Sequence, residues 1–234
     1  MHWFFDAELS NKSTQLPEAE AKHASSSLRI RVGEKIAVTN GSGLVGLAEV
    51  VESGKSSLSY SVISIQEHER TSPAIHLVQA LSKGDRDELA LQACVEIGVD
   101  QVMPWEAERS VVRWGSEKKS KGLARWQQIA IESMKQSQQA YLCKVDSMFE
   151  MNVPLSGRTI VLEPSADKTL ASMEFRPNEE INLIVGPEGG ISEAELKAFG
   201  AMGYQVAKLG NSVLRASTAG PVAVSVIRTM LRNW

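Results

Sequence analysis

Hydrophobic and polar positions follow two different patterns along this chain. Between Lys35 and Gln66, short runs rich in β-branched residues are separated by polar turn sequences that contain glycine. Runs of this kind, with an apolar residue at every second position, predict strands. The expected strands are Lys35 to Thr39, Leu44 to Val51 and Leu58 to Ile65. The pattern therefore predicts a small antiparallel sheet or barrel.

After the polar segment from Glu67 to Pro73, apolar runs alternate with segments of helical periodicity. Strands that alternate with helices typically form a mainly parallel sheet that is covered on both faces. The expected strands are Ile75 to Leu81, Gln101 to Trp105, Thr159 to Pro164, Ile181 to Val185 and Tyr204 to Leu209. We therefore expect an α/β chain with two domains, residues 1–70 and residues 71–234.

Capping residues mark the expected helix ends in the second domain. Asp85, with Glu88 three positions later, predicts the start of a helix that ends at Gly98. Gly220-Pro221 predicts the start of an apolar closing helix that runs to Leu231, because proline is tolerated in a first helical turn. The apolar residues of that helix must be buried, either within the chain or against a second copy.

A glycine-rich loop follows the strand from Ile181 to Val185. The chain reads Gly186-Pro187-Glu188-Gly189-Gly190, and Ser192 with Glu195 forms a capping box for the next helix. Glycine has no Cβ and adopts positive φ, so this loop lets a ligand approach the bare backbone. Neither the G-x-G-x-x-G spacing nor a phosphate-loop lysine is present, which disfavours a dinucleotide or triphosphate.

Composition limits the classes of protein to consider. Of 234 residues, 43% are hydrophobic, which is enough for a core, and no run of eighteen apolar residues occurs. We expect a soluble, cytoplasmic protein without a membrane span. Cys94 and Cys143 are far apart and lack a neighbouring histidine cluster, so reduced thiols and no metal site are expected. A net charge of −3 means that any nucleic-acid site is a local patch.

Such a patch is predicted between Arg109 and Arg125. Trp114 lies in this segment, and its indole is expected to be exposed. A basic surface neutralises phosphates and an exposed aromatic ring stacks on a base, so this combination suits binding of a nucleic acid. An ordinary solvated loop explains the same composition. Trp126 falls on the apolar face of a helical repeat and is expected in the core. The cations of the segment are Arg109, Arg113, Lys118, Lys119, Lys121 and Arg125.

Several stretches together resemble one known family. G-P-E-G-G-I-S-E-A-E, followed after some twenty residues by L-G-N-S-V-L-R-A-S-T-A, resembles the C-terminal motifs of the SPOUT methyltransferases. K-G-D-R with E-I-G-V, E-R-S-V-V and an N-terminal H-A-S-S-S-L-R-I-R-V-G-E resemble the RsmE family in particular. That family methylates N3 of a uridine in 16S ribosomal RNA of the small subunit.

The resemblance implies a fold, a cofactor and partners. It implies a PUA-like β-barrel domain that helps to hold RNA, followed by a SPOUT domain with a deep trefoil knot. S-adenosylmethionine is the implied methyl donor, 16S ribosomal RNA or the small ribosomal subunit the implied substrate, and a homodimer the implied assembly. No metal and no membrane are implied. Arg29 and Arg31, in the N-terminal motif, are candidate RNA contacts beside the cations already named.

The implied cofactor site lies where three strands break into glycine or proline. Its candidate residues are Leu162, Glu163, Pro164, Val185, Gly186, Glu188, Gly189, Gly190, Leu209, Gly210, Ser212, Leu214 and Ser217. Gly189→Val is expected to abolish cofactor binding by steric occlusion while leaving the fold largely intact. Arg215 is the candidate catalytic residue, because a guanidinium stabilises a developing uracil anion. Its alternative role is to brace the fold through backbone carbonyls.

Two departures from the family pattern keep other functions open. Ser217 stands where many members have a carboxylate, and Gln139 where many have an arginine. The general base therefore has no assignment, although Glu188 is the nearest carboxylate in the motif. The alternatives are a catalytically silent SPOUT-fold RNA-binding or ribosome-assembly protein, and a SPOUT methyltransferase with a different RNA target.

Overall fold

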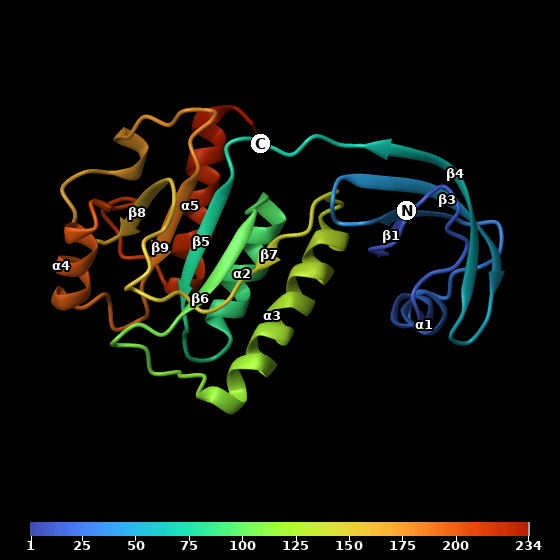
Figure 1. Ribbon diagram of the computed structural model, residues 1–234, viewed down its shortest axis with the longest axis horizontal. Helices are drawn as coiled ribbons and strands as arrows, with labels where there is room; N and C mark the ends of the chain where they lie inside the picture. The colour runs from blue at the N-terminus through green and yellow to red at the C-terminus, as the bar shows by residue number, and fades with distance from the viewer. Residues whose placement is uncertain (234) are drawn as a thin grey trace. The chain divides into compact units, whose positions relative to one another are not determined.

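The computed structural model describes residues 1–233, which form two compact units (Figure 1). The first unit contains Met1–Arg70 and also Met134–Leu142, and the second contains residues 71–133 and the chain from Cys143 onward. The sequence pattern placed Met134–Leu142 in the second domain. Its assignment to the first unit depends on contacts between segments far apart in the chain, which no local pattern reveals.

The first unit is built on a four-stranded sheet in the order β1-β2-β3-β4. The strands β2, β3 and β4 pair antiparallel, as expected, whereas β1 pairs parallel to β2 and was not expected. Phe4 of β1 is fully buried beside Ile36 and Val38, so this short strand contributes to the core of the unit. The elements are β1 (His2–Phe5), α1 (Glu18–Ser26), β2 (Lys35–Thr39), β3 (Leu44–Ser53) and β4 (Leu58–Glu67).

Backbone hydrogen bonds join the segment Met134–Leu142 to the turn between β2 and β3. Gly43 N–H donates to Ala140 O at 3.0 Å, and Leu142 N–H donates to Gly41 O at 2.9 Å. Gly43 has φ +107°, and a Cβ built on it would lie 2.6 Å from Tyr141 Oη. Glycine is therefore required at this position both by backbone conformation and by the close approach of Tyr141.

The second unit is built on a six-stranded, all-parallel sheet in the order β10-β8-β9-β5-β6-β7. This confirms the expected α/β class. All five residues of β9 are buried, which agrees with a strand covered by other elements on both faces. The strands are β5 (Ile75–Ala80), β6 (Gln101–Trp105), β7 (Lys144–Val145), β8 (Arg158–Leu162), β9 (Ile181–Val185) and β10 (Gln205–Ala207).

The helices of the second unit pack on both faces of this sheet (Figure 1). Phe199 of α4 packs with Trp105 and Val78 in a cluster on one face. On the other face, Gly220 of α5 approaches Leu77 and Cys94 closely. The helices are α2 (Arg86–Ile97), α3 (Ser116–Gln136), the 3₁₀ helix η1 (Leu170–Ser172), α4 (Glu193–Ala201) and α5 (Ala216–Leu231).

The predicted start of the last helix was wrong. The helix α5 begins at Ala216, and Pro221 lies inside it rather than in its first turn. Proline has no N–H, so the bond from position 221 to the carbonyl of Ser217 is missing. Tertiary packing outweighs this loss, because Ala216, Gly220 and Val224 are all buried.

One predicted cap was also wrong. Asp85 occupies the N-cap position of α2, but its φ is +58° and its side chain makes no capping hydrogen bond. Asp87 accepts instead, from Ser82 N–H at 3.2 Å and from Glu88 N–H at 2.9 Å. By contrast, Gly98 is confirmed as the left-handed C-cap of α2, with φ +95°.

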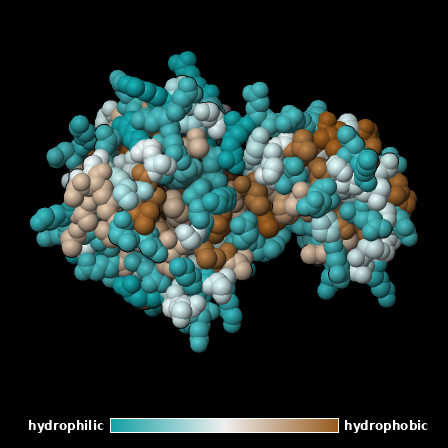
Figure 2. All heavy atoms as spheres, in the orientation of Figure 1, coloured by the Kyte–Doolittle hydropathy of each residue, from teal (hydrophilic) through white to brown (hydrophobic). Residues whose placement is uncertain are grey.

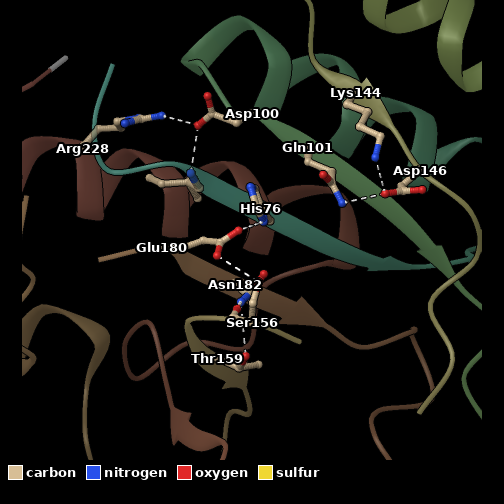
Figure 3. Close-up of polar contacts among 11 residues, drawn as sticks. His76, Asp100, Gln101, Lys144, Asp146, Ser156, Thr159, Glu180, Asn182 and Arg228 are labelled. Atoms are coloured by element: carbon tan, nitrogen blue, oxygen red, sulfur yellow. Dashed lines mark hydrogen bonds and ion pairs between the residues drawn. The ribbon is translucent and has the colours of Figure 1, made fainter. Parts of the chain in front are cut away.

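Polar contacts join neighbouring segments near the amino ends of β5, β6, β8 and β9 (Figure 3). His76 Nδ1 of β5 lies 3.2 Å from Glu180 Oε1, just before β9. Gln101 Nε2 of β6 donates to Asp146 Oδ2 at 3.0 Å, which joins β6 to the residue after β7. Asn182 of β9 donates to Thr159 Oγ1 of β8 at 3.4 Å.

Both cysteines are buried and free, as expected. Burial raises the pKa of the Cys94 thiol well above its usual range, and the nearby Cys143 adds to the effect. Cys94 is therefore a neutral core residue at physiological pH. The trefoil knot stays a prediction.

Candidate cofactor site

A cavity of about 310 Å³ lies at the carboxyl edge of the parallel sheet. Three loops form its walls, and they follow β8, β9 and β10. All the residues named as cofactor candidates line this cavity except Gly189 and Ser217, and Arg215 lines it as well. The sequence analysis missed further lining residues, namely Pro187, Ile191, Lys208 and Val213 in these loops and Ala216 and Ala219 in the first turn of α5.

The sheet topology explains why these loops converge. The strands β10, β8 and β9 are neighbours, and the register pairs Leu162 with both Val185 and Ala207. Parallel strands in register end at the same edge of a sheet, so the segments that leave them there lie side by side. Ligands bind outside the carboxyl ends of the strands in open parallel sheets. The convergence therefore marks a candidate binding site.

Close packing explains why glycine is needed in the loop after β9. A Cβ on Gly186 would lie 2.6 Å from Ile191 Cγ1, and Gly190 has φ +73°. A side chain at either position therefore disturbs the loop. Both glycines line the cavity, which leaves backbone atoms exposed to a ligand.

Gly189 occupies a different place from the one predicted. A Cβ on this residue would lie 3.0 Å from Arg109 Cβ and 3.2 Å from Arg109 O, and Gly189 does not line the cavity. The predicted steric occlusion of the cofactor by Gly189→Val therefore needs correction, because the added side chain meets Arg109. Arg109 Nη1 also donates to Gly189 O at 3.2 Å. This arginine contacts the glycine loop, besides being a candidate RNA contact.

Glu188 lines the cavity and has a fully engaged carboxylate oxygen. Its Oε1 accepts from Lys83 N–H at 3.1 Å and from Arg86 Nη1 at 2.9 Å. Burial raises the pKa of Glu188, but hydrogen bonds from its own N–H, from Arg86 and from Lys83 outweigh burial and lower that pKa overall. Glu188 is therefore an ionised acceptor and a poor candidate for the general base.

A second polar cluster fixes the start of α4 beside the cavity. The capping box is confirmed: Ser192 Oγ accepts from Glu195 N–H at 3.2 Å, and Glu195 Oε2 accepts from Ser192 N–H at 2.9 Å. Glu195 Oε1 also accepts from Glu108 N–H at 2.7 Å, and Ser192 Oγ contacts the Glu108 carboxylate. The loop after β6 is thereby held against the helix that follows the glycine loop.

Arg215 borders the cavity at the N-cap position of α5 and is exposed. Within residues 1–233, its guanidinium has no hydrogen bond and no ion pair, so the alternative of a brace to backbone carbonyls finds no support. Ser217 lies in the first turn of α5, outside the cavity lining. The absence of the family carboxylate at position 217 therefore does not change which residues line the cavity.

The structure divides the candidate RNA-binding cations into two groups. Arg113 donates to Glu108 O at 3.0 Å and lies 3.7 Å from Glu106, and Arg125 lies 3.0 Å from Glu88. These arginines, like Arg109, are engaged within the chain. The other candidates have side chains without a polar partner among the described residues; they are Arg29, Arg31, Lys118, Lys119 and Lys121.

Trp114 differs from its expected role as an exposed indole. It is half-buried and meets Trp126 edge to face, with ring centroids 5.5 Å apart. A Cβ on Gly122 would lie 2.7 Å from the Trp114 ring, so the indole packs directly on the backbone of α3. Trp126 is 1% exposed, which confirms it as a core residue. Trp114 therefore anchors the start of α3 instead of offering a free stacking surface.

Hydrophilic residues cover most of the second unit on the face drawn in Figure 2, and hydrophobic residues form small separate patches there. In the described part of the chain, no three His, Cys, Asp or Glu side chains are grouped so that they could hold a metal ion. None of the helices between residues 1 and 233 is both long and apolar enough to cross a membrane.

Comparison with known proteins adds to this geometry. A family model described as an RNA methyltransferase domain matches residues 69–228, and a model of an RNA methyltransferase PUA domain matches residues 16–62. The protein named ribosomal RNA small subunit methyltransferase E from Mycobacterium tuberculosis is 31% identical over 224 residues, which cover 92% of this chain and 86% of the relative. Its namesake from Bacillus subtilis is 28% identical over 221 residues, with coverages of 89% and 86%.

Solved structures agree over almost the whole chain. The crystal structure of a ribosomal RNA small subunit methyltransferase E from Neisseria gonorrhoeae bound to S-adenosyl methionine aligns with a TM-score of 0.88 and 30% identity, covering 98% of both chains. A methyltransferase from Legionella pneumophila in complex with its bound cofactor SAM aligns with a TM-score of 0.88 and 28% identity, covering 97% of this chain and 96% of the other.

Proposed function

The chain belongs to the RsmE family of small-subunit ribosomal RNA methyltransferases, and we propose that it transfers a methyl group from S-adenosylmethionine to N3 of a uridine in 16S ribosomal RNA. One observation carries the proposal. The loops after three neighbouring parallel strands meet at a single cavity, and Arg215, an arginine without a polar partner among residues 1–233, borders it. In this proposal the cofactor and the reacting base both lie next to one cation, Arg215.

The lining of the cavity suits S-adenosylmethionine. Leu162, Val185 and Leu209 offer apolar surface for the flat adenine ring, and the loops at Gly186 and Gly210 expose backbone groups for its ring nitrogens. A volume of about 310 Å³ lies within the usual range for small-molecule sites. When bound, this cofactor supplies a methyl group on a sulfonium sulfur, which is an activated electrophile.

Arg215 acts as a donor in this proposal. N3 lies on the Watson–Crick edge of uridine, so the base must leave its stack to reach the cavity. Removal of the N3 proton leaves negative charge on the uracil ring, and a guanidinium beside the ring stabilises that charge. Arginine stays protonated in proteins and is not a proton acceptor. Glu188 is engaged by Lys83 and Arg86, so the general base stays unassigned.

The RNA contacts are proposed for both units of the chain. The unpartnered lysines Lys118, Lys119 and Lys121 supply phosphate contacts in the second unit, and Arg29 and Arg31 supply them in the PUA-like unit. Arg109, Arg113 and Arg125 contribute less, because the structure engages them internally. We place the reaction in the cytoplasm, where small ribosomal subunits are its substrate.

A homodimer is proposed from the family. Val224 and Ile227 of α5 are buried within the chain, whereas Met230 is 40% exposed and Val222 and Val226 are half-buried. This remaining apolar surface supports an intersubunit contact through α5. Sedimentation velocity at micromolar concentration measures the assembly, and a monomer at all concentrations contradicts it.

Methyl transfer tests the proposed function. Purified protein is incubated with S-adenosylmethionine that carries a labelled methyl group and with small subunits or their naked RNA, and the RNA is digested to nucleosides. The expected product is 3-methyluridine. A ribose-methylated or differently methylated nucleoside indicates another RNA target. Tight RNA binding without any transfer indicates a catalytically silent RNA-binding protein.

The variant Arg215→Ala tests the role of the guanidinium. We expect kcat to fall by about 10² to 10³ while the Kd for S-adenosylmethionine is unchanged, because the lost interaction is made in the transition state. Arg215→Lys keeps the charge but loses the planar donor fork, so it should recover part of the rate. A wild-type rate for Arg215→Ala contradicts the assignment.

A further inference from the structure

The turn between β5 and α2 has an unusual backbone. Gly84 has φ +68° and Asp85 has φ +58°, so two consecutive residues are left-handed. Left-handed conformations outside glycine are sparsely populated and persist where the surrounding structure requires them. In this turn they bring Lys83 N–H and the Arg86 guanidinium to the same atom, Oε1 of Glu188, at 3.1 and 2.9 Å.

Arg86 is poorly placed for the stability of its own helix. It is the first residue of α2, and a helix N-terminus carries partial positive charge that disfavours a cation. Its partner is Glu188, in a loop that lies far away in the sequence. The favourable interaction of Arg86 is therefore with the cavity wall and not with the helix.

Glu188 connects this contact to the cavity. The carboxylate belongs to the loop from Gly186 to Gly190, and both glycines at its ends line the cavity. Three glycines give this loop a large conformational freedom, which must be restricted before a ligand binds tightly. Arg109 holds the loop at Gly189 O, and Arg86 holds it at Glu188.

We propose that Arg86 is a positioning residue for the cofactor site: by holding Glu188 against the turn at Lys83, it keeps the loop from Gly186 to Gly190 in the conformation that borders the cavity. This inference rests on the proposed function, since it assigns the cavity to S-adenosylmethionine. Arg86 acts through Glu188 and does not itself touch the cofactor.

Calorimetric titration with S-adenosylmethionine tests this role. Arg86→Ala should weaken binding about tenfold, the change expected when one partly exposed, charge-assisted hydrogen bond is lost. Arg86→Lys keeps the cation and should recover most of the affinity. The matched control is Lys144→Ala, which removes the cation of an exposed ion pair, 2.7 Å from Asp146, at the amino edge of the sheet. The affinity of the Lys144→Ala variant for S-adenosylmethionine should equal that of the wild type.

A double-mutant cycle shows whether Arg86 acts through Glu188. Glu188→Gln alone should also weaken binding, and the double variant Arg86→Ala with Glu188→Gln should bind about as well as the weaker single variant. Fully additive losses overturn the proposal. If Arg86→Ala fails to fold, Arg86→Gln provides a smaller change for the same cycle.

The outcomes separate this inference from the proposed function. A wild-type protein that is folded but does not bind S-adenosylmethionine overturns the proposed function. Wild-type binding together with an unchanged affinity for Arg86→Ala overturns the positioning role alone. A loss of RNA affinity in Arg86→Ala, with cofactor affinity unchanged, assigns Arg86 to the RNA instead and also overturns the positioning role.

Discussion

Nη2 of Arg228, in the last helix, lies 3.1 Å from Oδ2 of Asp100, just before β6 (Figure 3). The guanidinium also donates to Pro73 O at 2.9 Å and to Gly98 O at 2.6 Å, and the same Asp100 oxygen accepts from Ile75 N–H at 2.9 Å. Arg228 is 2% exposed. Burial lowers the pKa of this guanidinium, and the Asp100 carboxylate opposes that shift. One buried side chain thus ties α5 to the amino ends of β5 and β6.

Removal of this side chain should destabilise the second unit. We expect Arg228→Ala to lower the free energy of unfolding by about 3 to 5 kcal/mol, because it leaves the Asp100 carboxylate buried without its cation and two carbonyls without a donor. Urea denaturation measures the change. Lys197→Ala, which removes an exposed cation from α4, is the control and should stay within about 0.5 kcal/mol of the wild type. Equal unfolding midpoints for Arg228→Ala and the wild type would contradict this role.

Two glycine variants distinguish a residue that lines the cavity, Gly210, from a residue that packs against Arg109, Gly189. A Cβ on Gly210 would meet no protein atom within 4 Å, and Gly210 lines the cavity. Gly210→Ala should therefore leave thermal stability nearly unchanged and weaken the binding of S-adenosylmethionine, because the methyl group takes space next to the ligand. Gly189→Val should instead lower stability, since its side chain meets Arg109 at 3.0 Å. Thermal melting measures the stability of both variants, and calorimetry measures their binding of S-adenosylmethionine. A loss of stability in Gly210→Ala together with an unchanged stability in Gly189→Val would contradict this distinction.

Salt dependence should reveal which cations neutralise phosphates. We expect Lys118→Ala and Lys121→Ala each to reduce the slope of log K against log salt concentration by about 0.7, the value for one contact to single-stranded nucleic acid. Arg125→Ala should change the slope less, because this guanidinium already pairs with Glu88 at 3.0 Å. Titration of a labelled small-subunit RNA fragment at several salt concentrations measures the slopes. A larger effect for Arg125 than for the lysines would show that the ion pair opens for RNA.

Alkaline pH should destabilise the first unit through Tyr60. Burial, followed by the charge of Asp6, raises the pKa of the Tyr60 phenol from 10.0 to about 12. Because the folded pKa lies above the unfolded one, the stabilisation from the neutral phenol is fully present below pH 10 and is lost as the pH rises toward 12. The stability of the wild type relative to Tyr60→Phe should fall by about 2 to 3 kcal/mol over this window. Urea denaturation from pH 9 to 11.5 tests it, and a constant difference argues against the shift.

Local patterns were sufficient for two buried strands of the parallel sheet and for the loops that build the cavity. The bounds of β6 and β9 match the expected Gln101 to Trp105 and Ile181 to Val185, because strands buried on both faces appear as continuous apolar runs. The capping box at Ser192 spans three residues and is equally local. Most of the candidate cofactor residues line one cavity for the same reason, since they directly follow strands that end at one edge of the sheet.

Tertiary contacts decided where the last helix begins and how Trp114 is placed. The prediction started the closing helix at Gly220-Pro221, but the packing of Gly220 against Leu77 and Cys94 keeps the preceding turn, from Ala216, helical. Trp114 lies in a basic, polar segment, and its place against Trp126 depends on how the chain enters α3.

The sequence by itself determined most strands and helices of the parallel sheet and where the loops around the cavity begin, because these properties depend on neighbouring residues. The tertiary structure decided the pairs Arg86 with Glu188, Arg109 with Gly189 and Arg228 with Asp100, each of which joins residues far apart in the chain. The residues next to a charged side chain in the sequence do not indicate whether it faces water or pairs with a distant partner. Its role is settled only when the folded backbone brings that partner within hydrogen-bonding distance.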